Sequence, residues 1–164
     1  MMKKLLLPLL LSLAAALSAN AHCQIPCGIY GDELKFGELE QHVETITKSA
    51  RLVRELSAKD ELTAQDHQQL VRWVNNKESH ASKIIDEAAN YFLAQRIKPD
   101  QDHYKDKLEL LHHIILYSMK SKQSSDAEAP ETLGKKIAEF KGLYLDEEHH
   151  QHVKVHHDDK HRAE

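Results

Sequence analysis

The sequence predicts an all-α fold, an antiparallel up-and-down four-helix bundle, on three observations. Apolar residues recur at steps of three and four along four separate stretches, which is the period of an amphipathic helix. No stretch shows the alternation of apolar and polar residues that marks a half-buried strand. The 164 residues include only five Gly and four Pro, so few positions interrupt a helix. Four such helices with short connections pack most simply as one bundle, which we place at residues 31–145.

The first helix is expected over residues 31 to about 57, and the second from about residue 64 to Arg96. The first apolar stripe consists of Leu39, Val43, Ile46, Ala50, Val53 and Leu56. Thr63 and Asp66, three residues apart, are expected to form a capping box at the start of the second helix. The second stripe consists of Leu70, Val74, Ala81, Ile84, Ile85, Ala88 and Phe92. The sequence Lys98-Pro99-Asp100 ends this helix.

The third helix is expected from about His103 to Lys120, and the fourth begins near Pro130 after a polar linker. Proline suits the first helical turn because that turn leaves its backbone N–H groups without intrahelical partners. The inner face of the third helix is predicted to carry Leu108, Leu111, Ile115 and Met119. The inner face of the fourth is predicted to carry Leu133, Ile137, Phe140 and Tyr144.

Residues 1–21 are predicted to be a cleaved secretory signal peptide. Lys3-Lys4 precede an apolar run from Leu5 to Leu17, and Ala19-Asn20-Ala21 supplies the small residues that signal peptidase favours. The run is shorter than the about 20 residues of a transmembrane helix, so no stable membrane association is expected after cleavage. Cleavage after Ala21 would make His22 the N-terminus of a periplasmic or extracellular protein. It would also shift the net charge from −4 to about −6, which argues against nucleic-acid binding.

Residues 22–30, His-Cys-Gln-Ile-Pro-Cys-Gly-Ile-Tyr, would then bring an α-amine, an imidazole and two thiols together. A bound metal deprotonates a thiol, and an α-amine, with a pKa near about 8, is a ready donor at neutral pH. The amide nitrogen of Cys23 lies between amine and thiol, so its deprotonation closes two five-membered chelate rings. Nitrogen and sulfur donors in one plane suit square-planar Ni²⁺. A Cys23–Cys27 disulfide would close only a tiny loop and stabilise little.

This stretch, called the hook below, resembles the nickel-binding hook of nickel superoxide dismutases, His-Cys-x-x-Pro-Cys-Gly-x-Tyr. The resemblance implies that His22, Cys23 and Cys27 hold one nickel per subunit. It implies a catalytic Tyr30, which stands over the open face of the metal and helps to order substrate or solvent. It further implies disproportionation of superoxide to dioxygen and hydrogen peroxide by Ni(II)/Ni(III) cycling, in a homohexamer of four-helix bundles.

The remaining hook positions and two bundle residues complete the predicted site. Pro26 and Gly28 are expected to shape the turn that brings Cys27 back towards the metal. Counting from the hook without gaps puts Glu38 where the family has a glutamate that holds the other nitrogen of the histidine ligand. His80 stands where well-known members have an arginine that supports this glutamate.

Residues 146–164 are expected to form a disordered tail, because the apolar period stops there. Histidine-rich tracts commonly bind Ni²⁺, Zn²⁺ or Cu²⁺. The tail is therefore either an accessory metal site that collects nickel or a solvated segment without a role. Its histidines are His149, His150, His152, His156, His157 and His161.

Two other classes of protein remain open on the sequence alone. An exported nickel or copper carrier would also use a terminal histidine, thiols and a histidine-rich tail, but it would not turn over superoxide or need Tyr30. A helical structural protein with a terminal disulfide is the third class. It leaves unexplained why the cut site adjoins His22 and Cys23.

Overall fold

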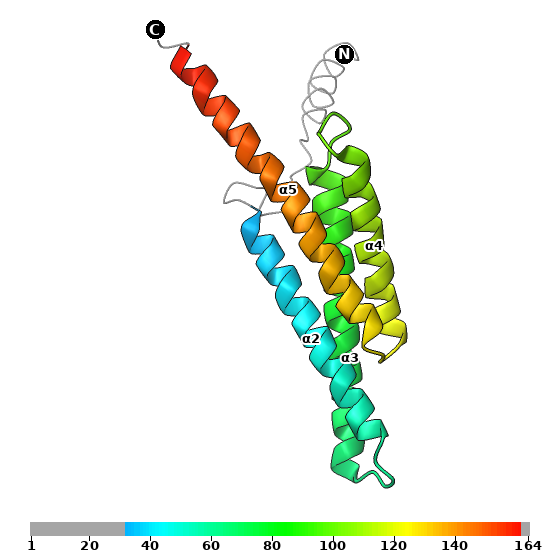
Figure 1. Ribbon diagram of the computed structural model, residues 1–164. Helices are drawn as coiled ribbons and strands as arrows, with labels where there is room; N and C mark the ends of the chain where they lie inside the picture. The colour runs from blue at the N-terminus through cyan, green and yellow to red at the C-terminus, as the bar shows by residue number, and fades with distance from the viewer. Residues whose placement is uncertain (1–31, 162–164) are drawn as a thin grey trace, which may run out of the picture.

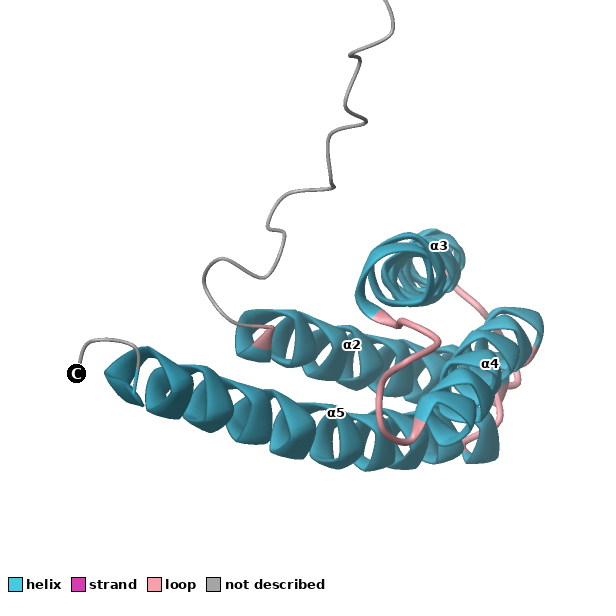
Figure 2. Cartoon of the chain, turned by 90° about the horizontal axis from the view of Figure 1, so that it is seen from above, coloured by secondary structure: helices cyan, strands magenta, loops and turns pink. Residues whose placement is uncertain are grey.

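The computed structural model describes the backbone of residues 32–161 and the side chains of residues 32–146. It contains α2 (Glu33–Ser57), α3 (Ala64–Asp86) continued by the π-helix η2 (Glu87–Arg96), α4 (Tyr104–Gln123) and α5 (Glu128–His161). Each helix packs against the next and α5 returns beside α2, as Figures 1 and 2 show. No strand occurs among these residues, so the predicted all-α bundle is confirmed. None of the helices in this part of the chain combines the length and apolarity of a membrane span.

The start of α3 follows the capping signal that the sequence predicts. Thr63 Oγ1 accepts a hydrogen bond from the Asp66 backbone N–H at 3.2 Å, and the Asp66 carboxylate accepts one from the Thr63 N–H at 3.0 Å. Lys59 donates to the same carboxylate at 2.6 Å. The hydrogen bonds from Lys59 and Thr63 lower the pKa of Asp66 to about 2. Pro130 lies in the first turn of α5, also as predicted.

An aromatic cluster from α2, η2 and α5 forms the centre of the core. All of its side chains are almost fully buried, and every pair of ring centroids is between 5.0 and 5.7 Å apart. Such distances suit the offset and edge-on contacts that aromatic rings prefer. The four residues are Phe36, Phe92, Phe140 and Tyr144.

The prediction that Met119 faces the core was wrong, because its side chain is 39% exposed. The buried face of α4 instead carries Lys107, Leu111, Ile114, Ser118 and Ser121. Polar residues interrupt this face, so a search for apolar residues at helical spacing does not detect it. Lys107 is tolerated there with its Nζ 5.9 Å from the centre of the Tyr144 ring. Ser121 Oγ is satisfied by the carbonyl of Tyr117 at 2.8 Å.

The backbone of α5 continues past the predicted start of the tail. The sequence predicts a disordered tail from residue 146, whereas α5 runs on to His161 and extends beyond the rest of the bundle in Figure 1. The physical reason is the absence of a stop signal. The only proline of α5 lies in its first turn, and its last glycine is Gly142.

The last ten residues of the second predicted helix adopt a π-helical register, which the sequence does not predict. The backbone N–H of Ile97, which follows η2, bonds to the carbonyl of Phe92 at 3.0 Å, five residues earlier. In this register residues five apart lie close to the same face. Tyr91 and Arg96 are such a pair, and both reach the start of α2.

Candidate functional site

Most of the predicted site lies outside the described residues. The structure does place Glu38 on α2 and His80 on α3. The predicted residues that precede the described part of the chain are His22, Cys23, Pro26, Cys27, Gly28 and Tyr30. The side chains of the tail histidines also lie outside the described ones. The observable part of the site is therefore the end of the bundle where α2 begins, immediately after the hook.

Asp32, two residues after Tyr30, is the centre of a buried polar cluster at this end. Its side chain has 0% exposure. The Tyr91 hydroxyl donates to one carboxylate oxygen and the Tyr144 hydroxyl to the other. Arg96 Nε donates to the second oxygen at 2.7 Å and to the Tyr144 hydroxyl oxygen at 2.9 Å. The buried carboxylate is thus both paired with a cation and hydrogen-bonded, which compensates for its removal from water.

Burial alone would lower the pKa of Arg96. The neighbouring Tyr144 and Asp32 outweigh that effect and raise the pKa above its ordinary value. The guanidinium therefore stays charged and remains able to pair with the Asp32 carboxylate.

Lys35 joins this cluster to Glu38. Its Nζ lies 2.9 Å from Glu87 Oε1, 3.3 Å from Glu38 Oε2 and 5.3 Å from the centre of the Tyr91 ring. Burial would lower the pKa of Lys35, but its hydrogen bonds to the two glutamates and their charges raise it above 10.5. Glu38 itself is 56% exposed, so its carboxylate is accessible to a second partner.

His80 meets His42, which lies one turn after Glu38 on α2. The two Nδ1 atoms are 3.1 Å apart and the rings are edge-on, with centroids 4.8 Å apart. Burial is the main cause that lowers the pKa of both imidazoles, and Lys83 adds to it. Glu38 opposes the change at His42 only in part. The pair is therefore neutral at pH 7, and one ring nitrogen donates to the other.

The described side chains do not themselves make a metal site. No group of three or more His, Cys, Asp or Glu residues among them lies close enough to hold an ion. Both cysteines of the chain are in the hook. A nickel centre that changes oxidation state needs strong anionic donors, and thiolates are the ones that this chain offers. The donor set of the hook therefore fits nickel.

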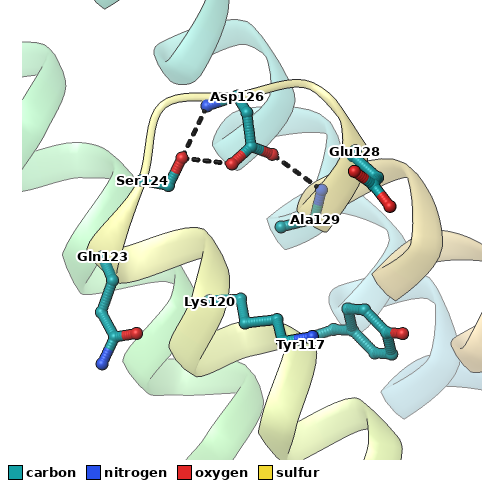
Figure 3. A pocket seen from close by; sticks show the side chains of 7 residues that line it. All are labelled: Tyr117, Lys120, Gln123, Ser124, Asp126, Glu128 and Ala129. Atoms are coloured by element: carbon teal, nitrogen blue, oxygen red, sulfur yellow. Dashed lines mark hydrogen bonds between the residues drawn. The ribbon is translucent and has the colours of Figure 1, made fainter.

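A cavity of about 220 Å³ lies at the opposite end of the bundle, between α4 and α5 (Figure 3). The Ala129 backbone N–H donates to Asp126 Oδ1 at 3.0 Å, and the Asp126 N–H donates to Ser124 Oγ at 3.0 Å. These bonds close the turn and cap the start of α5. The lining residues include no predicted site residue; they are Tyr117, Lys120, Gln123, Ser124, Asp126, Glu128 and Ala129.

Sequence reasoning missed three residues at the hook end: Asp32, Lys35 and His42. His42 was detectable, because residues four apart share one helix face and Glu38 precedes it by four. Asp32 stands at a helix start, where an aspartate is normally an exposed cap. Its burial depends on partners from η2 and α5, which no local pattern reveals.

Comparison with known families agrees with the hook and the bundle. The model of the family described as nickel-containing superoxide dismutase matches residues 17–148, well over half of the chain. The match includes the whole hook and ends at residue 148, before the first tail histidine. No curated protein and no solved structure matched the chain. With four packed helices among the described residues, two cysteines placed in the hook and this match, the chain belongs to the nickel-containing superoxide dismutase family, oxidoreductases that disproportionate superoxide at a nickel centre.

Proposed function

We propose that the mature protein begins at His22 and that the hook holds the catalytic nickel. The observation that carries the proposal is the position of the cysteines, because both lie within six residues of the predicted cut after Ala21. The proposed donors are the amine and imidazole of His22, the amide nitrogen and thiolate of Cys23, and the thiolate of Cys27. The family match begins at residue 17 and so spans the cut site and the hook together, in support of this reading.

These donors would hold nickel, which would supply the one-electron redox chemistry, between Ni(II) and Ni(III), that the disproportionation of superoxide needs. Two superoxide anions and two protons thereby yield dioxygen and hydrogen peroxide. The chain would contribute the two thiolates, which form when the thiols of Cys23 and Cys27 lose their protons. It would also place the substrate. Tyr30 is proposed to order superoxide or water beside the metal and to pass on a proton from its hydroxyl.

Glu38 is proposed to hold the second imidazole nitrogen of His22, as a partner that orients a metal ligand. Two observations support this role. More than half of the Glu38 side chain is exposed, and its contact with Lys35, at 3.3 Å, is longer than the 2.7–2.9 Å usual for a charge-assisted hydrogen bond. His80 is proposed to support Glu38 indirectly, through His42 one helical turn away.

We further propose export to the periplasm or beyond, cleavage by signal peptidase, and assembly into a homohexamer. Residues 1–21 support export. Four large apolar side chains with exposures of 38–67% offer contact surface to other subunits; they are Leu34, Val71, Leu116 and Met119.

The tail is proposed to collect nickel. Histidines four positions apart fall on one face of a helix, the spacing of a two-histidine chelate. Residues 152 and 156, and residues 157 and 161, have this spacing within α5.

The test is the N-terminal sequence and intact mass of the mature protein, with and without nickel, together with its dismutase activity. The proposal expects a chain that begins at His22, carries one nickel and turns over superoxide. A chain that begins elsewhere has no amine donor in the hook and would overturn it. Nickel binding without turnover would support the carrier instead.

A matched control isolates the amine. One alanine added before His22 retains every side chain but displaces the terminal amine, and we expect it to abolish activity without a change in the melting point of the apo-protein.

A further inference from the structure

We propose that Asp32 is a positioning residue for the nickel hook. Its carboxylate fixes the point at which the chain leaves the bundle, and thereby the orientation of the hook relative to Glu38. The inference rests on the proposed function, because it assumes that nickel is bound at residues 22–30. It assigns to the Asp32 cluster a role that concerns geometry at the metal and not only stability.

The partners of the Asp32 carboxylate come from two elements other than α2. The carboxylate accepts hydrogen bonds from Tyr91 and Arg96 on η2 and from Tyr144 on α5. The start of α2 is thereby tied to two other elements through one fully buried side chain. In the sequence the hook ends at residue 30, two positions before this anchor.

The Asp32 carboxylate does not act as a helix cap. Asp32 occupies the N-cap position of α2, yet its side chain makes no capping hydrogen bond. The backbone N–H groups of Lys35 and Phe36 bond to the Asp32 carbonyl at 3.0 and 3.3 Å. The Asp32 backbone carbonyl thus contributes to the start of the helix, while its side chain is committed to tertiary contacts.

The π-helical register of η2 brings two partners of Asp32 together. Tyr91 and Arg96 are five residues apart, and hydrogen bonding across five residues brings both to the face that meets Asp32. π-Helical segments occur frequently at functional sites. Lys35, which lies over the Tyr91 ring and contacts Glu38, connects the anchor to the residue proposed to hold His22. Lys35 therefore links the Asp32 cluster to Glu38 through described contacts.

The experiment compares wild-type protein with Asp32→Asn, both mature and loaded with nickel. Asparagine has nearly the same shape but lacks the charge that pairs with Arg96. We expect full nickel loading, an altered electron paramagnetic resonance spectrum of the oxidised nickel, and a loss of about tenfold or more in kcat, because small misplacements of reacting groups cost up to about 10²-fold. KM is expected to change less than kcat.

Asp66→Asn is the matched control. Asp66, like Asp32, has a cationic partner and a hydroxyl donor, here Lys59 and Thr63, but it lies in the first turn of α3, beside the turn that joins α2 and α3. This variant is expected to lose stability while its nickel spectrum and kcat stay those of wild type. Equal spectra and rates in Asp32→Asn and Asp66→Asn would overturn the inference.

A milder variant, Tyr144→Phe, removes one donor to Asp32 and decides the matter if Asp32→Asn does not fold. The inference expects its spectrum to differ from wild type, and a wild-type spectrum and rate would overturn it. Wild-type protein that binds no nickel at the hook would refute the proposed function instead, so the two failures are distinguishable.

Discussion

Replacement of Lys77 by methionine tests how the bundle closes the end of α4. Lys77 is only 4% exposed, and burial lowers its pKa. Its Nζ donates to the carbonyls of Ser121, Lys122 and Ser124 at 2.6, 2.7 and 2.9 Å. The last carbonyls of a helix have no intrahelical partner, so one ammonium group from α3 satisfies the C-terminus of α4.

The expected loss follows from these three bonds. A hydrogen bond to a charged group contributes about 1.5–3 kcal/mol, so the three together give a gross effect of about 4.5–9 kcal/mol. Methionine removes the cost of burying an ammonium group, and this offsets several kcal/mol of the loss. Water also replaces part of the interaction at the more accessible carbonyls. We expect Lys77→Met to lower the free energy of unfolding by about 2–4 kcal/mol, which corresponds to a melting point on the order of 10 °C lower.

The measurement is urea unfolding followed by far-ultraviolet circular dichroism, with an unchanged m-value as the sign that the same fold is compared. Lys135→Met is the control, because Lys135 pairs with Glu131 at 2.7 Å while both side chains are 66% exposed. Solvent screens an ion pair that is exposed to this extent, so its loss is expected to change the stability little. A Lys77→Met loss no larger than that of the control would refute the reasoning.

Three further predictions concern pH, the hook and the core. Because burial lowers the pKa of His42 and His80, the unfolded chain takes up protons first, and stability falls as the pH drops below the ordinary histidine value of about 6.5. Replacement of both by glutamine should flatten the urea midpoint between pH 7 and 5, and an unchanged slope would contradict the assignment. Cys27→Ser is expected to abolish nickel binding and dismutase activity while the apo-protein melts as wild type, because serine keeps about the size of the side chain and removes only the thiolate; retained activity would exclude the thiolate as a donor. Phe36→Ala should cost about 3–5 kcal/mol in calorimetry, and Phe36→Leu clearly less, because Phe36 contacts three aromatic rings; equal losses would show that ring packing is not the cause.

The bundle was predictable because its elements carry local signals. The period of three and four residues locates α2 and α3, and the capping box at Thr63 marks the start of α3. The inner face of α4 was not predictable by the same method. Lys107 and Ser118 lie on it, and their burial depends on neighbours that the local sequence does not name.

The candidate site also has one part that the sequence predicts and one part that it does not. Donor chemistry is readable from the hook, since residue type and position after the cut decide which atoms can bind nickel. The support at the bundle end is not readable, since Asp32 meets Tyr144 across 112 positions of the chain and Lys35 meets Glu87 across 52. Contacts of this separation arise from the packing of whole helices.

The π-helical register of η2 has a consequence for comparing relatives. A π-helical turn accommodates one more residue than an α-helical turn, so a chain with one residue fewer between positions 87 and 96 would wind as an ordinary helix there. Its counterparts of Tyr91 and Arg96 would then point in different directions, and the aspartate would lose one of them. The length of this segment, counted across homologous sequences, therefore reports which members can bring both residues to the aspartate.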